Sequence, residues 1–287
     1  MPLVSVDGVK IGYSEHGEGE PVLMVMGTGS PGHVWELHQV PALVRAGYRV
    51  ITFDNRGIAP LAYGAPKPTV EDIVGDVVGL IRYVCGGRAH LIGTSMGAHV
   101  VQEVLVAHPE LAASAVLMAT RGRQDAFRTA LADAEARLYA SGVQPPPLYT
   151  ATAKALQSLS PHTLNDEAAV RTWLDLLELF PPPLEVLRAQ TLLESIGDRL
   201  GAYRTIAARC MVLAFADDLI TPPHLNREVA DAIAGCRYEL VERCGHFGYL
   251  ERPDAVNALL LDFLDGISTI HDERRMRAHE FPAKTRT

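Results

Sequence analysis

The chain has 287 residues, of which 48% are hydrophobic and 21% are charged. These values are ordinary for a globular protein with enough chain to bury a full core, and they exclude a disordered or fibrous protein. The 26 Lys and Arg against 34 Asp and Glu give a net charge of −8. Because such a protein lacks the positive surface that neutralises phosphates, we expect no nucleic-acid partner.

The cysteines and the N-terminus indicate the compartment. Four cysteines, with no C-x-x-C pair, are too few for a disulfide scaffold and have no metal-type spacing, so we expect reduced, buried thiols and no metal. Residues 1–8 contain neither a basic n-region nor an apolar h-region, and no run of 18 apolar residues occurs in the chain. The sequence therefore predicts a cytoplasmic protein that does not associate with membranes.

The first elements in chain order indicate an α/β fold. Residues 3–6 and 10–13 alternate around Asp7-Gly8, a dipeptide that favours a tight hairpin turn. The apolar runs 21–26 and 50–53 follow, with a helical stretch over 35–45 between them. Continuously apolar strands separated by helices are typical of a parallel sheet that is covered on both faces.

The alternation continues, with one interruption. The remaining pattern predicts a helix over 69–84, a strand over 90–92, a helix over 98–108, a strand over 115–118, a strand over 211–215, a helix over 224–234, a strand over 238–241 and a helix over 253–263. Residues 121–208 have helical patterns, two Pro-Pro-Pro runs and no convincing strand. We call residues 121–208 the helical insertion.

The predicted fold is a mostly parallel, doubly wound sheet that opens with a β-hairpin and carries a helical cap inserted after the sixth strand. The expected organisation is a core formed by residues 1–120 and 209–266, a cap formed by residues 121–208, and a charged, flexible tail over residues 267–287.

The segment Gly93-Thr94-Ser95-Met96-Gly97 carries the strongest chemical signal. This G-x-S-x-G pattern follows a predicted strand and precedes a predicted helix, the context in which small residues permit a sharp turn that exposes the serine hydroxyl. A serine hydroxyl is a weak nucleophile that needs a base, and the base needs an orienting acid. Ser95 is therefore a candidate nucleophile.

Two further residues supply the missing groups. Asp218 follows the strand over 211–215, and His246 follows the strand over 238–241. Because the carboxyl ends of parallel strands meet at one edge of a sheet, both side chains should lie at the same edge as Ser95. Asp217, the neighbour of Asp218, is the alternative acid.

With these three motifs in the order Ser, Asp, His, the sequence from about residue 3 to residue 264 resembles the α/β-hydrolases. The likeness extends to Asp54-Asn55-Arg56-Gly57, to Gly245-His246-Phe247 and to Glu251-Arg252-Pro253. It is closest to bacterial esterases, cofactor-free haloperoxidase-like proteins and polyketide thioesterase-like proteins. The resemblance implies Ser95 as nucleophile, His246 as general base and then acid, and Asp218 as the orienting carboxylate. The family pattern of an acid followed by x-x-x-Pro favours Asp218 over Asp217, because Pro222 is in place.

The resemblance also implies two backbone donors for an oxyanion. Met96, which follows the nucleophile, supplies one N–H group. Met26-Gly27-Thr28 occupies the position of the family's His-Gly-x, so that Thr28 supplies the other. Met26 departs from the usual His, which should alter the pocket lining more than the charge stabilisation, because the donors are backbone groups.

The same loop contains a competing motif. Gly27-Thr28-Gly29-Ser30-Pro31-Gly32 reads as G-x-G-x-x-G after a strand, with Asp54 some twenty residues further on, as in a dinucleotide-binding fold. Pro31 removes a backbone N–H where the pyrophosphate would need one. A nucleotide-dependent oxidoreductase would also leave Ser95, Asp218 and His246 unexplained.

Three lesser features remain open. Trp35 is either a core anchor or a wall of the substrate pocket. Arg56 fits a structural ion pair within its loop better than a substrate ligand. The helical stripe Trp173, Leu176, Leu177 and Phe180 fits packing within the insertion better than direct contact with substrate.

These residues predict a serine hydrolase that works without a cofactor. The expected substrate is an ester or thioester of a moderately large apolar small molecule, including one linked to a carrier or to CoA, in bacterial specialised metabolism. A Ser rather than an Asp at position 95 argues against an epoxide hydrolase or a haloalkane dehalogenase. The alternative is a non-hydrolytic cyclase or lyase of the same fold that acts on a polyketide-like intermediate.

Overall fold

The computed structural model describes residues 2–56, 58, 68–191, 193 and 196–280, and its centre is an eight-stranded sheet of order β1-β2-β4-β3-β5-β6-β7-β8. The strands are β1 (Leu3–Val6), β2 (Val9–His16), β3 (Glu20–Val25), β4 (Tyr48–Phe53), β5 (Ala89–Thr94), β6 (Ala112–Met118), β7 (Cys210–Phe215) and β8 (Arg237–Val241). All the pairings from β4 to β8 are parallel. The predicted fold class is therefore confirmed.

The predicted hairpin forms the antiparallel edge of this sheet. β1 pairs with β2 around Asp7 and Gly8, whose φ angles of 47° and 82° are those of the turn that matches the twist of the two strands. β2 then pairs antiparallel with β4. The hairpin thus extends the sheet on the side away from the segments that carry Asp218 and His246.

Strand alternation divides the interior into two cores. Leu23 and Val25 of β3 point into one core, and Val22 and Met24 point into the other. Both cores are fully apolar along this strand, as expected for a sheet with helices on both faces.

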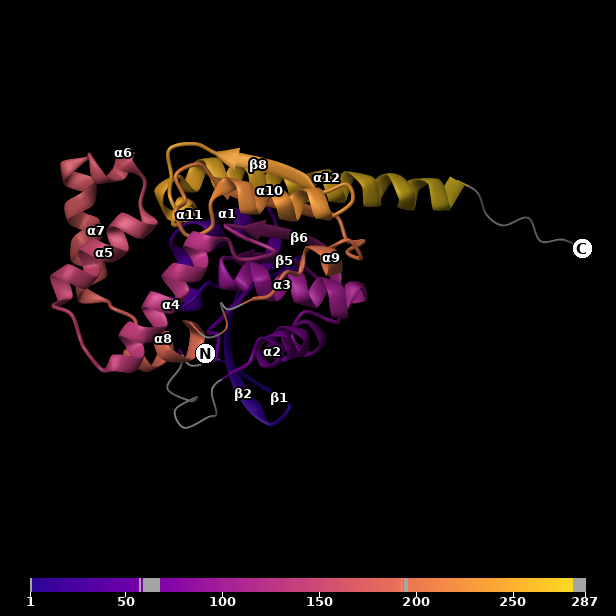
Figure 1. Cartoon of the computed structure of the whole chain (residues 1–287). Helices are drawn as coiled ribbons and strands as arrows, with labels where there is room; N and C mark the ends of the chain where they lie inside the picture. Colours follow the sequence, from indigo (N-terminus) through magenta and orange to yellow (C-terminus); the bar gives the residue numbers. More distant parts are fainter. Residues whose placement is uncertain (1, 57, 59–67, 192, 194–195, 281–287) are drawn as a thin grey trace, which may run out of the picture.

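Helices from different parts of the chain cover the two faces (Figure 1). The first core is covered by α2 (Val70–Tyr83), α3 (Met96–Ala107) and α10 (Pro223–Ala232). The second is covered by the 3-10 helix η1 (Gly32–Leu37), by α1 (Gln39–Arg45), by α11 (Gly248–Glu251) and by the first part of α12 (Pro253–Glu280). α12 continues beyond residue 266, so that the predicted tail is helical as far as Glu280. Residues 281–287 of that tail lie outside the described residues.

Over its described residues, the insertion consists of six helices, most of which stand beside the sheet, whereas the last of them lies near α3 and α10 (Figure 1). They are α4 (Ala126–Ser141), α5 (Pro147–Ser158), α6 (Pro161–Leu164), α7 (Glu167–Leu179), α8 (Leu184–Thr191) and α9 (Leu200–Tyr203). α7 buries none of its residues, and Leu176 and Phe180 of the predicted stripe are exposed by 47% and 75%. The stripe is therefore not the packed interior that the sequence suggested.

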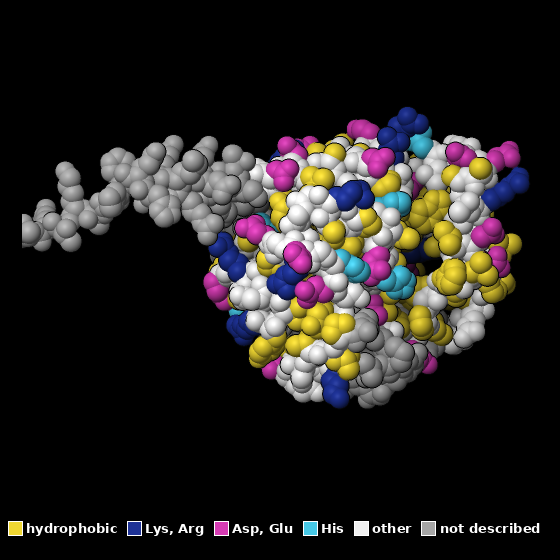
Figure 2. All heavy atoms as spheres, turned by 180° about the vertical axis from the view of Figure 1, so that it is seen from behind, with side chains coloured by type: hydrophobic (Ala, Val, Ile, Leu, Met, Phe, Trp, Pro, Cys, Tyr) yellow, Lys and Arg dark blue, Asp and Glu magenta, His cyan; other side chains and the backbone are white. Residues whose placement is uncertain are grey.

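The molecular surface is hollowed between the body and the insertion, and hydrophobic side chains gather around this hollow (Figure 2). Many large exposed apolar side chains of the molecule belong to the insertion, namely Phe127, Leu138, Val143, Leu148, Tyr149, Leu156, Leu176, Leu179 and Phe180. Because soluble monomers rarely expose so much apolar surface in one region, this part of the molecule is a candidate for binding an apolar ligand.

The four cysteines are free thiols, and three of them are buried. Burial raises the pKa of the Cys85 and Cys244 thiols to about 12 and the pKa of Cys236 to about 11, and it also raises the pKa of Cys210. Since the thiolate is the reactive species, these groups should be chemically inert in the folded protein.

We therefore predict that the native protein at pH 8 reacts slowly with Ellman's reagent, because roughly one thiol in a thousand or fewer would be ionised. All four cysteines should react after denaturation in guanidinium. The absorbance of the released thionitrobenzoate measures both. Rapid stoichiometric labelling of the native protein would contradict the burial of these thiols.

Candidate active site

Ser95 lies in the sharp turn between β5 and α3. Its backbone angles, φ 53° and ψ −120°, fall in a sparsely populated region that costs a non-glycine residue about 1–3 kcal/mol. The Ser95 N–H donates to the carbonyl of Met118 at the end of β6, over 2.9 Å. The turn thus holds Ser95 at the carboxyl edge of the sheet.

The glycines of the motif are required by close packing. A Cβ atom on Gly97 would lie 2.2 Å from the carbonyl oxygen of Val25, and one on Gly93 would lie 2.5 Å from the carbonyl oxygen of Gly97. A Cβ atom on Gly27 would lie 3.2 Å from Cβ of Ser95. The loop after β3, the end of β5 and the start of α3 therefore meet tightly around the serine.

The structure brings Asp218 and His246 into direct contact. Oδ2 of Asp218 lies 2.8 Å from Nδ1 of His246, and the exposed fractions of the two side chains are 0% and 8%. Because a carboxylate only accepts hydrogen bonds, this contact places the ring proton of a neutral His246 on Nδ1. Nε2 then carries the lone pair that a base needs.

The Asp218 carboxylate is held by its own loop. Its Oδ1 accepts from the backbone N–H groups of Ile220 and Thr221 at 2.8 and 2.9 Å, and its Oδ2 accepts from Oγ1 of Thr221 at 2.7 Å. Oγ1 of Thr221 also lies 3.4 Å from Nδ1 of His246. These bonds fix the direction in which the carboxylate faces the imidazole.

A buried network that the sequence did not reveal links this loop to α3. Nδ2 of Asn226, on α10, donates to the carbonyl of Thr221 over 2.7 Å, and Oδ1 of Asn226 accepts from the N–H of Thr120 over 2.8 Å. The Thr120 hydroxyl in turn bonds to the side-chain oxygen of Gln102 on α3. The Asp218 loop is thereby tied to the helix that begins immediately after Ser95.

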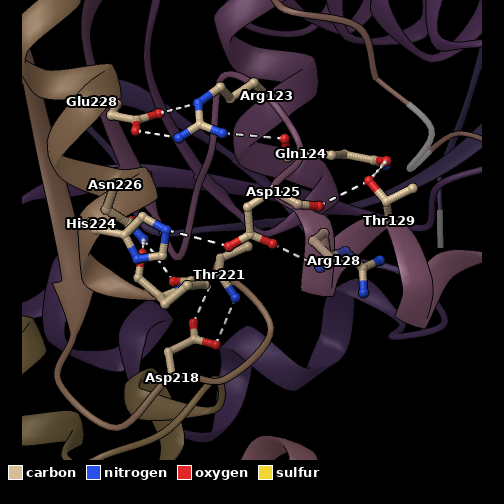
Figure 3. Close-up of polar contacts among 11 residues, drawn as sticks. Arg123, Gln124, Asp125, Arg128, Thr129, Asp218, Thr221, His224, Asn226 and Glu228 are labelled. Carbon is tan, nitrogen blue, oxygen red and sulfur yellow. Dashed lines mark hydrogen bonds and ion pairs between the residues drawn. The ribbon is translucent and has the colours of Figure 1, made fainter.

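The same region anchors the start of the insertion (Figure 3). Arg123 pairs with Glu228 at 2.5 and 2.7 Å, and Asp125 lies 3.3 Å from Nε2 of His224. His224 and Glu228 both belong to α10, which follows the Asp218 loop. The segment that leads into α4 is therefore attached to the helix that follows the Asp218 loop.

Glu251 connects the loop of His246 to the middle of the insertion. Its Oε2 accepts from the N–H of Gly245 over 2.6 Å. Its Oε1 accepts from the hydroxyls of Ser160 and Thr163 at 2.8 and 2.6 Å and from the N–H of Ser160 at 2.9 Å. One carboxylate thus satisfies four donors across the junction, and the sequence showed Glu251 only as part of the family resemblance.

Phe247 extends this junction. Its ring stacks on Trp173 of α7 with centroids 5.9 Å apart, and its N–H donates to the carbonyl of Ser158. Trp173 of the predicted stripe thus contacts the loop of His246, outside the insertion.

The loop after β3 brings Gly27 close to Ser95, as described above, and Thr28 is the next residue of that loop. Nδ2 of Asn55 donates to the carbonyl of Met26 over 2.7 Å, and Oδ1 of Asp54 accepts from the N–H of Gly32 over 2.7 Å. The G-x-G-x-x-G segment is therefore folded against the end of β4 and uses Asp54 within the protein.

The structure also places the two open candidates, Trp35 and Arg56. Trp35 is fully buried and packs on Tyr249 with ring centroids 4.9 Å apart, which favours a core anchor over a pocket wall.

Arg56 pairs with the buried Asp76 of α2 at 2.5 and 2.8 Å rather than within its own loop. Burial raises the pKa of Asp76, although the bonds from Arg56 act in the opposite direction. Gly57, the next residue of that motif, lies outside the described residues.

The described part of the chain contains neither a membrane-spanning helix nor a cluster of metal ligands. No described helix is both long enough and apolar enough to cross a bilayer. No group of three or more His, Cys, Asp or Glu side chains is gathered in the described residues as a metal ion would require.

The chain is similar in sequence and fold to several known proteins. The protein of Mycobacterium tuberculosis (H37Rv) named "Putative non-heme bromoperoxidase BpoC" is 46% identical over 260 residues, which cover 90% of this chain and 99% of that protein. Its crystal structure superposes with a TM-score of 0.88 over 90% of this chain and 97% of that one. Epoxide hydrolase A of the same organism is 27% identical over 323 residues, covering 92% and 97%.

The fold is also shared more widely. The crystal structure of the enol-lactonase from Burkholderia xenovorans LB400 has a TM-score of 0.78 at 24% identity and covers 92% of this chain and all of that one. Residues 22–259 match the sequence pattern of the alpha/beta hydrolase family. This chain therefore belongs to the alpha/beta hydrolase family.

Proposed function

We propose that the protein is a serine hydrolase that cleaves an ester or thioester through an acyl-enzyme, with Ser95 as nucleophile, His246 as base and Asp218 as the orienting acid. The observation that carries this proposal is the 2.8 Å contact between Asp218 and Nδ1 of His246, at the edge of the sheet where the turn presents Ser95. Nε2 of His246 takes the Ser95 proton as Oγ attacks the carbonyl carbon, and returns it to the leaving group.

Two backbone N–H groups would stabilise the oxyanion that forms in this attack. Met96 is the first residue of α3, where the N–H groups of a helix start carry partial positive charge. Thr28 follows Gly27, which approaches Ser95 closely. The oxyanion would lie between these two segments.

The substrate proposal follows from the surface. The hydrophobic side chains that gather around the hollow between the body and the insertion favour a moderately large apolar acyl or leaving group (Figure 2). A carrier-linked or CoA-linked thioester and a cytoplasmic setting remain predictions from the sequence.

The BpoC comparison gives a second candidate reaction for the same residues. A relative that is 46% identical over 90% of the chain carries the name bromoperoxidase. Hydrogen peroxide is therefore a candidate acceptor of the acyl group in place of water. The acyl group would then pass from Ser95 to peroxide and leave as a peracid, which oxidises bromide. Bromide oxidation in the presence of acetate and peroxide tests this reaction.

Replacing the proposed nucleophile tests the acyl-enzyme directly. Ser95→Ala should lower kcat for p-nitrophenyl esters by about a thousandfold or more, because the acyl-enzyme can no longer form. Mass spectrometry of the wild-type protein after treatment with a fluorophosphonate should show one adduct on Ser95. Unchanged turnover by the variant would exclude the acyl-enzyme and favour the cyclase or lyase alternative.

The length of the substrate's acyl chain should affect the rate. Across p-nitrophenyl esters from acetate to decanoate, kcat/KM should rise with the acyl chain as more apolar surface is buried in the hollow, by about threefold to fourfold per CH₂ while the pocket has room. A parallel series of acyl thioesters compares the two leaving groups. A steady fall in kcat/KM from acetate onward would contradict an apolar pocket.

Thr221 holds the Asp218 carboxylate with a 2.7 Å hydrogen bond, and its longer contact to His246 is 3.4 Å. Thr221→Val should lower kcat by roughly tenfold or more, because one hydrogen bond to the buried carboxylate is lost. Thr221→Ser, which keeps the hydroxyl, should retain most of the activity. If Thr221→Val keeps its kcat while Thr221→Ser loses activity, the methyl group rather than the bond to Asp218 matters.

A further inference from the structure

We infer that Gln190, a buried side chain of the insertion, is a positioning residue for the oxyanion loop, which we define as residues 26–29 after β3. The inference rests on the proposed function, because it assigns a role to the loop that carries Thr28. It adds a residue from outside the core to the machinery that holds the transition state.

Gln190 makes two hydrogen bonds to backbone groups that are distant in sequence. Its Oε1 accepts from the N–H of Gly29 over 2.7 Å, and its Nε2 donates to the carbonyl of Arg56 over 3.0 Å. Gln190 is fully buried. Since one partner only donates and the other only accepts, the orientation of the amide is determined. Gln190 therefore joins the loop after β3 to the loop after β4.

The bond to Gly29 completes a series of restraints on the oxyanion loop. The carbonyl of Met26 accepts from Asn55, and the carbonyl of Gly27 accepts from the N–H of Ser30 over 3.4 Å. The N–H of Gly29 donates to Gln190. Three successive peptide groups, 26–27, 27–28 and 28–29, are thus each held by at least one hydrogen bond.

These restraints determine where the N–H of Thr28 points. In a trans peptide the N–H is antiparallel to the carbonyl of the same peptide group, so the bond from Ser30 to Gly27 sets the direction of the Thr28 N–H. Asn55 and Gln190 hold the two flanking peptide groups. Of these three restraints, only the one from Gln190 originates in the insertion.

Packing supports the same coupling. Gly29 has a φ of +73°, and a Cβ atom there would lie 3.2 Å from Pro182 and 3.3 Å from Leu187, both in the segment that leads to Gln190. The insertion therefore lies directly on the oxyanion loop. Loss of the Gln190 amide would leave a buried N–H on Gly29 without its acceptor, and the peptide would rotate to find another one.

The test compares two substitutions with a matched control. Gln190→Met keeps the length of the side chain and removes both bonds. Gln190→Glu keeps an acceptor for Gly29, and in its protonated form also a donor for Arg56. The control, Gln39→Met, removes an equally buried amide whose Nε2 donates to the carbonyl of Tyr249 over 2.8 Å. Circular dichroism and thermal unfolding establish that each variant is folded at the assay temperature.

The readout is the affinity for an alkyl boronic acid, whose boron forms a covalent bond to Oγ of Ser95 and becomes a tetrahedral anion, while His246 takes the hydroxyl proton. For Gln190→Met we expect kcat to fall by about 10- to 100-fold, the boronate to bind more weakly by a similar factor, and KM to change little. Gln190→Glu should retain more activity than Gln190→Met, even if it is the less stable variant. Gln39→Met should lose stability and keep its kcat.

Two outcomes would overturn the inference. In the first, Gln190→Met has the kcat and boronate affinity of the wild type. In the second, the activities of the three variants follow only their melting temperatures, which would indicate a general structural role. An active Ser95→Ala protein would instead refute the proposed function itself, so that the two failures are distinguishable.

Discussion

The backbone of Ser95 is the constraint on which the rest of the site depends. A serine at φ 53° and ψ −120° is stable only where its neighbours leave no alternative. Here the Ser95 N–H is bound by the carbonyl of Met118, and Gly93 and Gly97 lie too close to neighbouring carbonyls for any side chain. The packing of β3, β5 and β6 therefore stabilises a turn that the local sequence would not adopt alone, and the hydroxyl projects from the sheet edge as a result.

A rigid nucleophile is useful only if the base is held equally well. Thr120 donates to Gln102 and to Asn226, and Asn226 donates to Thr221, so that these hydrogen bonds join α3 to the loop of Asp218. The members of this network are buried, where an unmade hydrogen bond costs about 1–3 kcal/mol. Small rotations of the loop are therefore unfavourable, and the carboxylate keeps its direction toward the imidazole.

The insertion contacts the core where the chemistry is proposed to occur. Glu251 ties Ser160 and Thr163 to the loop of His246, and Gln190 ties α8 to the oxyanion loop. Both contacts are hydrogen bonds between buried or half-buried polar groups. The helices of the insertion meanwhile leave large apolar side chains exposed. The insertion thus combines polar attachment to the core with an apolar surface, which suits a binding site for an apolar substrate.

The sequence by itself determined the elements, their order along the chain and the residues that follow each strand, because these depend on local signals. Apolar runs predict strands, and Ser95, Asp218 and His246 stand directly after three of them. The prediction that the stripe on α7 packs in the interior of the insertion was wrong. Periodicity shows that residues lie on one face of a helix, but it does not show what packs against that face.

Only the tertiary structure decided which groups support these three residues. Gln190 contacts a glycine 161 positions away, and Arg56 pairs with α2 and not within its loop. Such partners are mostly backbone N–H and carbonyl groups, which every residue possesses, so no pattern of side chains marks them in advance. Their identity follows from how the packed sheet brings distant loops to one edge, and that arrangement exists only once the whole chain is folded.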